Sequence, residues 1–302
     1  MMKTDTAIVM LAHNGVEFTR HALESILCAQ SLPQEMFLVD NCSDDETPAL
    51  IRDIAPKFES AGISFTTWRN AENLGCSLAR NQAWEKVASK YTVFMDNDAA
   101  VCSADWLDVL SAHFEADSRL ALLGPKIIYP FKPHCIQSAG VSFNRAGRVS
   151  FLGRGTPRDN PRFAKYGERE ALISACWLMR TDLRSSIGML DELYHPVQYE
   201  DLDLCLRARF AGMKVCYTPD VEIYHFEGMT TASVGQAEYA SNIARNSLKF
   251  KQAYRDYFPN RKDLIPPEPE DFIWLRREEL PITPELDLEY KTRGNFKTSD
   301  NN

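Results

Sequence analysis

Four short apolar runs recur at nearly equal intervals in the first hundred residues, and this spacing constrains the fold more than any other feature. The runs end at residues 12, 39, 68 and 95, about 28 residues apart. Helical patterns lie between them, for example the apolar stripe of Glu17–Gln30. Such spacing is typical of consecutive βαβ units, which make their strands parallel, so we expect an α/β fold with a doubly wound sheet. The predicted strands are Ala7–Ala12, Met36–Val39, Ser64–Trp68 and Tyr91–Met95.

The pattern beyond residue 120 is less regular. Residues 129–170 are rich in Gly, Pro and Arg, which favours a long excursion or a small hairpin sheet. The other elements expected there are a strand at Leu120–Ile128, a strand or buried turn at Ala171–Arg180, a helix from Glu200 that Gly212 stops, strands at Lys214–Thr218 and Val221–Tyr224, and a long helix at Gln236–Phe258.

Proline content marks a boundary near residue 259. Six of the chain's 16 prolines fall in its last 44 residues, so 259–302 is interpreted as a proline-rich linker or tail. Within it the apolar run Phe272–Leu275 is expected to dock on the body or on a second copy of the chain, which would form a homo-oligomer. The body is expected to span 1–258.

Composition excludes several classes of protein. The net charge of −8 argues against binding to a nucleic-acid backbone. No window approaches the roughly 18 uninterrupted apolar residues of a membrane-spanning helix, and no secretion signal is apparent. The eight cysteines include no C-x-x-C pair, which favours reduced thiols. We expect a cytoplasmic protein, either free or peripheral to the inner face of a membrane.

Polar residues follow the predicted strands, at the edge where ligands bind to such sheets. Asp96-Asn97-Asp98 directly follows a strand, and its two carboxylates could hold one hard cation, Mg²⁺ or Mn²⁺. Glu200, Asp201 and Asp203 begin a helix, where acids also serve simply to complement the helix dipole, although one of them could be a general base. His225 ends a strand-like run and becomes a candidate ligand only if it lies near Asp98.

Other nucleotide-binding motifs and the hydrolase motif are incomplete or absent. Gly153-Arg154-Gly155 opens like a dinucleotide fingerprint, but Arg158 stands at the third Gly position. The sequence contains no P-loop and no G-x-S-x-G elbow.

Six segments in order resemble the family 2 glycosyltransferases of the GT-A fold, over roughly residues 6–258. That family's fold is a Rossmann-like, mostly parallel sheet flanked by helices, with a smaller acceptor-side sheet. The resemblance implies that 1–258 is a glycosyltransferase domain of this fold, with a nucleotide-binding half at about 1–120 and an acceptor-side half at about 121–258. The segments that carry the resemblance are the first strand with His13-Asn14, Val39–Thr47, Asn73–Asn81 with its A-R-N ending, Asp96-Asn97-Asp98, Glu200–Asp203 with Arg207 and Gly212, and His225.

The resemblance implies an inverting transfer of a hexosyl or deoxyhexosyl group from a nucleoside diphosphate to an acceptor hydroxyl, typically in polysaccharide biosynthesis. It implies that Asp201 is the base and that Glu200 positions the acceptor. Asp98 would bind Mn²⁺ or Mg²⁺, with His225 as a further ligand and Asp96 facing the ribose or the metal. The donor-binding residues would be Leu11, Ala12, His13, Asp40, Asn73, Gly75, Arg80, Asp96, Asn97 and Trp177.

The sequence does not identify the donor or the acceptor. The donor could be a UDP-, dTDP- or GDP-sugar, and the acceptor a carbohydrate, a lipid-linked molecule or another hydroxyl compound. One alternative is a sugar nucleotidyltransferase, but the loop His13–Glu17 has one Gly and no Lys to grip a triphosphate. The other is a noncatalytic nucleotide-sugar-binding protein, which would not need a base such as Asp201.

Overall fold

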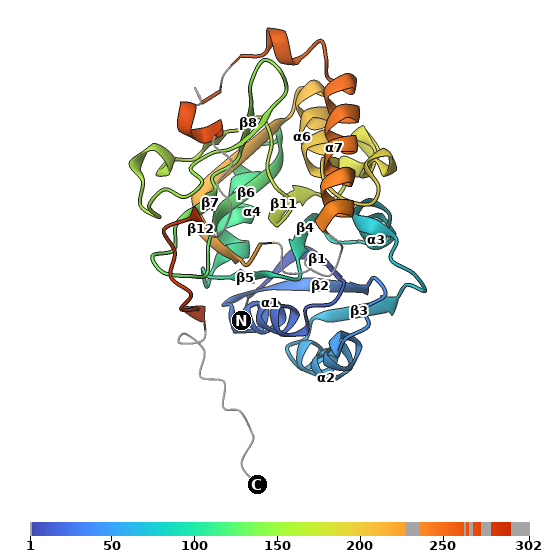
Figure 1. Ribbon diagram of the computed structural model, residues 1–302. Coiled ribbons are helices and arrows are strands. Elements are labelled where there is room, and N and C mark those ends of the chain that lie inside the picture. Colours follow the sequence, from blue (N-terminus) through green and yellow to red (C-terminus); the bar gives the residue numbers. More distant parts are fainter. Residues whose placement is uncertain (1, 228–235, 263, 266–267, 273–278, 291–302) are drawn as a thin grey trace.

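The four predicted strands form one parallel group at one side of a larger sheet. In the computed structural model, which describes residues 2–227, 236–262, 264–265, 268–272 and 279–290, they are β1 (Met2–Ala12), β2 (Ser31–Asp40), β3 (Ser64–Arg69) and β4 (Tyr91–Asp96). Their order is β4-β1-β2-β3, and every neighbouring pair is parallel (Figure 1). The predicted doubly wound arrangement is confirmed.

Strand side chains alternate between the two faces of this sheet, and both faces are apolar, so helices cover both of them. In β1, Ala7 and Val9 face one core cluster, while Ile8 and Met10 face the other. The first cluster lies under α3 (Gly75–Trp84), α6 (Glu200–Phe210) and α7 (Gln236–Ala253). The second lies under α1 (Val16–Cys28), α2 (Thr47–Ser60) and α4 (Trp106–Ala116).

The second half of the chain extends the same sheet. The strand β11 (Cys176–Arg180) lies antiparallel between β4 and β6 (Leu120–Ile128), and β12 (Lys214–His225) lies parallel to β6. Short strands β5 (Ala99–Val101), β7 (Ile136–Ser138) and β10 (Gly167–Glu168) complete ten strands. The two expected halves therefore share one continuous sheet.

Two predicted strands are one. Lys214–Thr218 and Val221–Tyr224 both belong to β12, and its register against β6 shifts between Tyr217 and Glu222. Pro219 lies in this irregular stretch, as expected because proline has no N–H for the ladder.

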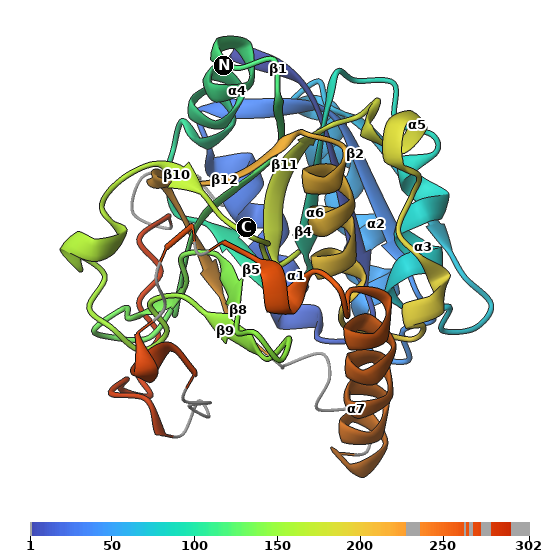
Figure 2. The same ribbon diagram turned by 90° about the horizontal axis from the view of Figure 1, so that it is seen from above.

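The expected small hairpin sheet is present as β8 (Val141–Phe143) and β9 (Val149–Phe151). It lies beside α7, as Figure 2 shows, and Phe143 contacts Phe250 with ring centroids 5.6 Å apart. The shorter helices are α5 (Leu183–Ile187) and the 3₁₀ turns Pro161–Phe163, Glu192–Tyr194, Phe258–Asn260 and Pro269–Phe272.

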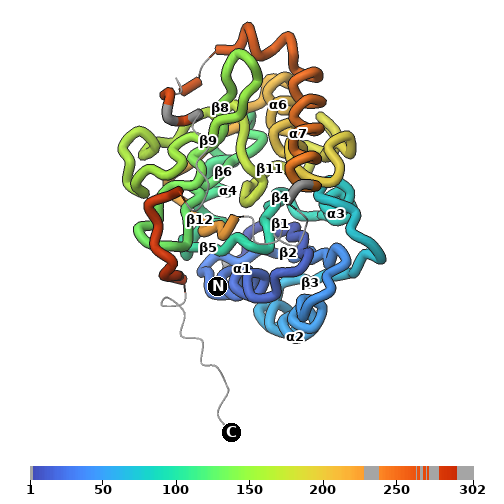
Figure 3. The backbone as a smooth tube through the Cα atoms, in the orientation of Figure 1, coloured from blue at the N-terminus to red at the C-terminus, as the bar shows by residue number. Residues whose placement is uncertain are grey.

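Part of the proline-rich tail docks on the body. The segment 279–290, red in Figure 3, buries Leu280, Leu288 and Tyr290 in a third apolar cluster with residues such as Phe131. The Tyr290 hydroxyl also lies 2.8 Å from Nδ1 of His21 on α1. Three residues of the apolar run expected to dock, 273–275, lie outside the described residues.

Candidate functional site

Strand pairing brings Asp96, Asp98 and His225 together. Asp96 ends β4, and β5 then pairs antiparallel with β12 so that Ala99 lies opposite His225. The Phe226 amide donates to the Asp98 carbonyl at 2.9 Å and closes this junction. Nε2 of His225 is 3.2 Å from an Asp98 carboxylate oxygen and 3.8 Å from one of Asp96. His225 therefore meets the condition that made it a candidate ligand.

The three side chains fit a divalent cation. One ligand atom from each lies within 4.8 Å of the other two, and two carboxylates with one imidazole are a donor set that Mn²⁺ or Mg²⁺ accepts. Burial raises the pKa of Asp96 against the charge of Arg80, and Asp98 adds to the rise. Burial alone would lower the pKa of His225, but the charges of Asp98 and Asp96 raise it to about 9. A bound cation would favour the ionised form of these two closely spaced carboxylates.

Asn97 lies between the two acids but faces the protein. Its amide nitrogen donates to the Asn14 carbonyl at 3.0 Å and to the Thr19 hydroxyl at 2.8 Å. It thus ties the turn after β4 to the loop after β1.

A second acidic cluster begins α6. Glu200 is buried, and its Oε2 has no hydrogen-bond partner among the described residues. Asp201 is partly exposed and accepts from the backbone amides of Leu202 at 2.8 Å and Ser174 at 3.3 Å. Burial, with the charge of Asp201, raises the pKa of Glu200 to about 8, and burial raises the pKa of Asp201 to about 6.

Asp203 is a structural residue. It accepts hydrogen bonds from the Tyr254 hydroxyl at 2.6 Å and from Nε of Arg207 at 2.7 Å. This contact holds α7 against α6, as expected for a carboxylate that is not used in chemistry.

Arg80 connects the two acidic clusters. Its guanidinium is 2% exposed, donates to Asp96, and lies 3.8 Å from Glu200. It also donates to the Ser174 hydroxyl at 3.0 Å. The resemblance implies that Arg80 contacts the donor, but its two terminal nitrogens contact Ser174 and Asp96.

The predicted nucleotide side gathers around Asn41, just past β2. Asp40 accepts from Arg69 and from the Ser43 amide, both at 2.8 Å. The side chain of Asn73 accepts from Asn41 at 2.8 Å, and the Asn41 carbonyl lies 3.0 Å from Nδ1 of His13. The structure therefore brings the ends of β1, β2 and β3 together, as the strand-end rule predicts.

Gly75 is required for packing. Its φ of +71° is left-handed, and a Cβ there would lie 2.6 Å from the Pro196 carbonyl oxygen. Only glycine allows the start of α3 to approach the segment before α6 so closely.

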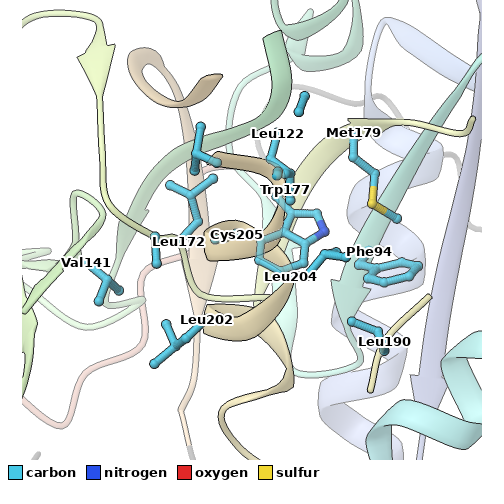
Figure 4. Close-up of a cluster of buried hydrophobic side chains, with 14 of the residues drawn as sticks. Phe94, Leu122, Val141, Leu172, Trp177, Met179, Leu190, Leu202, Leu204 and Cys205 are labelled. Carbon is cyan, nitrogen blue, oxygen red and sulfur yellow. The ribbon is translucent and has the colours of Figure 1, made fainter. Parts of the chain in front are cut away.

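Three of the expected donor-binding residues lie in or against the core. Trp177 is fully buried on β11, beside Phe94 and Met179, as Figure 4 shows. Its position in the first apolar cluster gives it a packing role, and its expected contact with the donor stays a prediction. Ala12 is also fully buried, whereas Leu11 is partly exposed.

Two polar residues near the site were not predicted. Gln137 on β7 contacts the ring of His225, and Ser174, just before β11, contacts both Arg80 and Asp201. Neither follows a predicted parallel strand, so the strand-end rule could not find them.

Comparison with known proteins extends this description. A curated relative, the O-antigen biosynthesis protein RfbC of Myxococcus xanthus, is 26% identical over 245 residues, which are 77% of this chain and 18% of RfbC. The chain spans 28% and 18% of the length of the first two curated relatives that it matches.

Solved structures share the fold. The crystal structure of GalNAc-T7 with UDP, GalNAc and Mn²⁺ has a TM-score of 0.65 at 16% identity, covering 84% of this chain and 48% of that one. The mannosyltransferase PcManGT from Pyrobaculum calidifontis, in complex with GDP-Man and Mn²⁺, has a TM-score of 0.60 at 16% identity, covering 85% and 66%. Residues 7–184 match the sequence profile of glycosyl transferase family 2, and the chain, with its mostly parallel sheet and paired acidic clusters, belongs to that family.

Proposed function

We propose that this protein transfers a sugar from a nucleoside diphosphate to an acceptor hydroxyl with inversion at the anomeric carbon. The observation that carries the proposal is the pair of acidic clusters on either side of Arg80. Asp96, Asp98 and His225 form a candidate cation centre, and Asp201 is a partly exposed carboxylate beyond Arg80. Family membership and the RfbC relative support glycosyl transfer in saccharide assembly.

The chemistry needs both clusters. The bond between the anomeric carbon and the diphosphate breaks, and its electron pair leaves with the diphosphate. A bound divalent cation would neutralise the charge that develops there. The acceptor oxygen forms the new bond from the opposite face, and its proton passes to Asp201. With a pKa of about 6, Asp201 is mainly ionised at neutral pH and able to accept that proton.

The substrates are proposed by analogy. GalNAc-T7 was solved with UDP and PcManGT with GDP-Man, which supports a UDP- or GDP-sugar donor for this chain. The O-antigen role in the name of RfbC supports a saccharide acceptor, either free or lipid-linked.

The test is a donor screen followed by product analysis. UDP-, GDP- and dTDP-sugars are incubated with the protein in Mn²⁺ or in EDTA, and released nucleoside diphosphate is measured. We expect nucleoside diphosphate to be released from one class of donor, in Mn²⁺ but not in EDTA. NMR of the transferred sugar should show inverted configuration. Tight donor binding without turnover, with or without saccharide acceptors, would favour a noncatalytic nucleotide-sugar-binding protein, and retained configuration would contradict the mechanism.

A further inference from the structure

Gln137 brings a third strand to the candidate cation centre. It lies on β7, which pairs antiparallel with β6, and its side chain is buried at 1% exposure. Its Oε1 lies 2.5 Å from Nδ1 of His225, and its Nε2 lies 3.3 Å from the backbone oxygen of the same residue. One amide therefore contacts both the ring and the main chain of His225.

Together the two contacts determine the orientation of the Gln137 amide. The His225 carbonyl oxygen can only accept, so the end of Gln137 that faces it must be the NH₂ group. The other end is then the amide oxygen, which needs a hydrogen on Nδ1 of His225. A neutral imidazole with its hydrogen on Nδ1 has its lone pair on Nε2, the atom that faces Asp98 at 3.2 Å and Asp96 at 3.8 Å.

We propose that Gln137 is a positioning residue that holds the His225 ring with Nε2 directed at the cation. The inference rests on the proposed function, which places a cation between Asp96, Asp98 and His225. Without the amide oxygen the ring is free to turn about its χ2 bond or to carry its hydrogen on Nε2, and either change removes a ligand. Partners of this kind orient metal-binding histidines, and their loss typically lowers metal affinity by about 10- to 100-fold.

The chain offers a matched control on the same short strand. Ser138 follows Gln137 and is also 1% exposed, but its hydroxyl donates to the Gly140 carbonyl at 3.1 Å. Ser138→Ala therefore disturbs β7 to a comparable degree while leaving the contact with His225 in place.

The experiment measures binding of Mn²⁺ alone, by electron paramagnetic resonance of the free ion, on full-length variants. Gln137→Met keeps the length of the side chain but removes the acceptor, and we expect its affinity for Mn²⁺ to fall by about 10- to 100-fold. Gln137→Glu keeps an acceptor for Nδ1 but loses the donor to the His225 carbonyl, so its affinity should fall less than that of the Met variant. Ser138→Ala should bind as the parent does. Gln137→Leu replaces the Met variant if the melting temperature shows that the latter is unfolded.

Two results would overturn the role of Gln137. One is a folded Met or Leu variant that binds Mn²⁺ as tightly as the parent does. The other is a Glu variant that loses as much affinity for Mn²⁺ as the Met variant loses. Binding of Mn²⁺ to the Asp98→Ala variant distinguishes a wrong role for Gln137 from a wrong proposed function. If Asp98→Ala also binds Mn²⁺ like the parent, the cation centre itself is wrong; if it loses binding while Gln137→Met does not, only the role of Gln137 is wrong.

Discussion

Arg80 is buried between two carboxylates that belong to different parts of the candidate site. Asp96 belongs to the candidate cation centre and Glu200 to the acidic cluster at the start of α6, and the guanidinium contacts both. Removing one member of a buried ion pair leaves the other member uncompensated, which costs far more than losing a pair at the surface. The stability of this region therefore depends on a residue that lies between the two acidic clusters of the candidate site.

Arg80→Met should lower the free energy of unfolding by about 3–5 kcal/mol, because Asp96 and the buried Glu200 both lose their guanidinium partner. Arg20→Met is the control, since Arg20 lies 3.7 Å from Glu17 and both are exposed; its cost should be at most about 1 kcal/mol. Urea denaturation at pH 7 measures both. Equal losses in the two variants would contradict the assigned burial of the Arg80 contacts.

Asp201→Asn should lower kcat by about 10²- to 10⁴-fold while donor and Mn²⁺ affinity stay near parental, because the amide cannot accept the acceptor's proton. In the parent, kcat/KM should rise with pH through about 6 and then level off, since the base must be ionised. Steady-state kinetics with separate donor-binding measurements checks both effects. A variant that keeps more than about a tenth of parental kcat would move the role of base to Glu200.

The sequence identifies the acids of the site better than the residues that hold them. Asp96, Asp98 and Asp201 follow or begin regular elements, where polar side chains stand out from apolar surroundings. Gln137 could not be found in this way because β7 has three residues and no distinctive pattern. The burial of Trp177 in the core could not be predicted either, because an aromatic residue has the same sequence signature whether it lines a pocket or fills a core.

At the scale of elements, βαβ units were predicted well and their exceptions were not. The units around β1 to β4 repeat a strong local pattern, so their order and direction follow from chain connectivity. The position of β11 between β4 and β6 depends on pairing between distant segments, which no local pattern encodes. No helix was predicted for α4, although Trp106, Leu110 and Phe114 lie on one helical face in the core.

The start of α6 should make stability depend on pH. The pKa of Glu200 is raised to about 8 in the folded protein from an ordinary value of 4.5, chiefly by burial. The folded state therefore binds more protons than the unfolded state between these values, so stability falls as pH rises through that window. Glu200→Gln removes this loss, and its free energy of unfolding relative to the parent should increase from pH 5 to pH 9.

Urea titrations of parent and Glu200→Gln at pH 5, 7 and 9 measure the effect. Exposed Glu192 lies just before α6, and Glu192→Gln serves as the control with no expected change in slope. A pH-independent difference between Glu200→Gln and the parent would show that Glu200 titrates normally.

At the scale of the whole molecule, the described part of the tail is integrated with the body. Besides its three buried side chains, it places Asp287 beside Lys132 and Glu289 beside Arg158. None of the helices in the described ranges is long and apolar enough to cross a membrane. The expectation that the tail joins two copies of the chain stays a prediction.

Ending the chain after residue 278 should lower the melting temperature, since it exposes the apolar surface that Leu280, Leu288 and Tyr290 cover. At about 1.5–3 kcal/mol for each buried side chain, the loss should be several kcal/mol. A chain ending after Tyr290 is the control and should melt like the parent. Calorimetry gives the melting temperatures, and light scattering on the same samples shows whether the tail also joins two copies. Unchanged melting in the shorter chain would contradict the docking.

The central position of β11 also determines the order in which the molecule can be completed. β11 follows both β4 and β6 in the sequence, so neither of these strands can have its neighbour in the finished sheet until residues 176–180 are made. β12, which carries His225, is made later still. The sheet can therefore be completed only once synthesis has reached the last third of the chain.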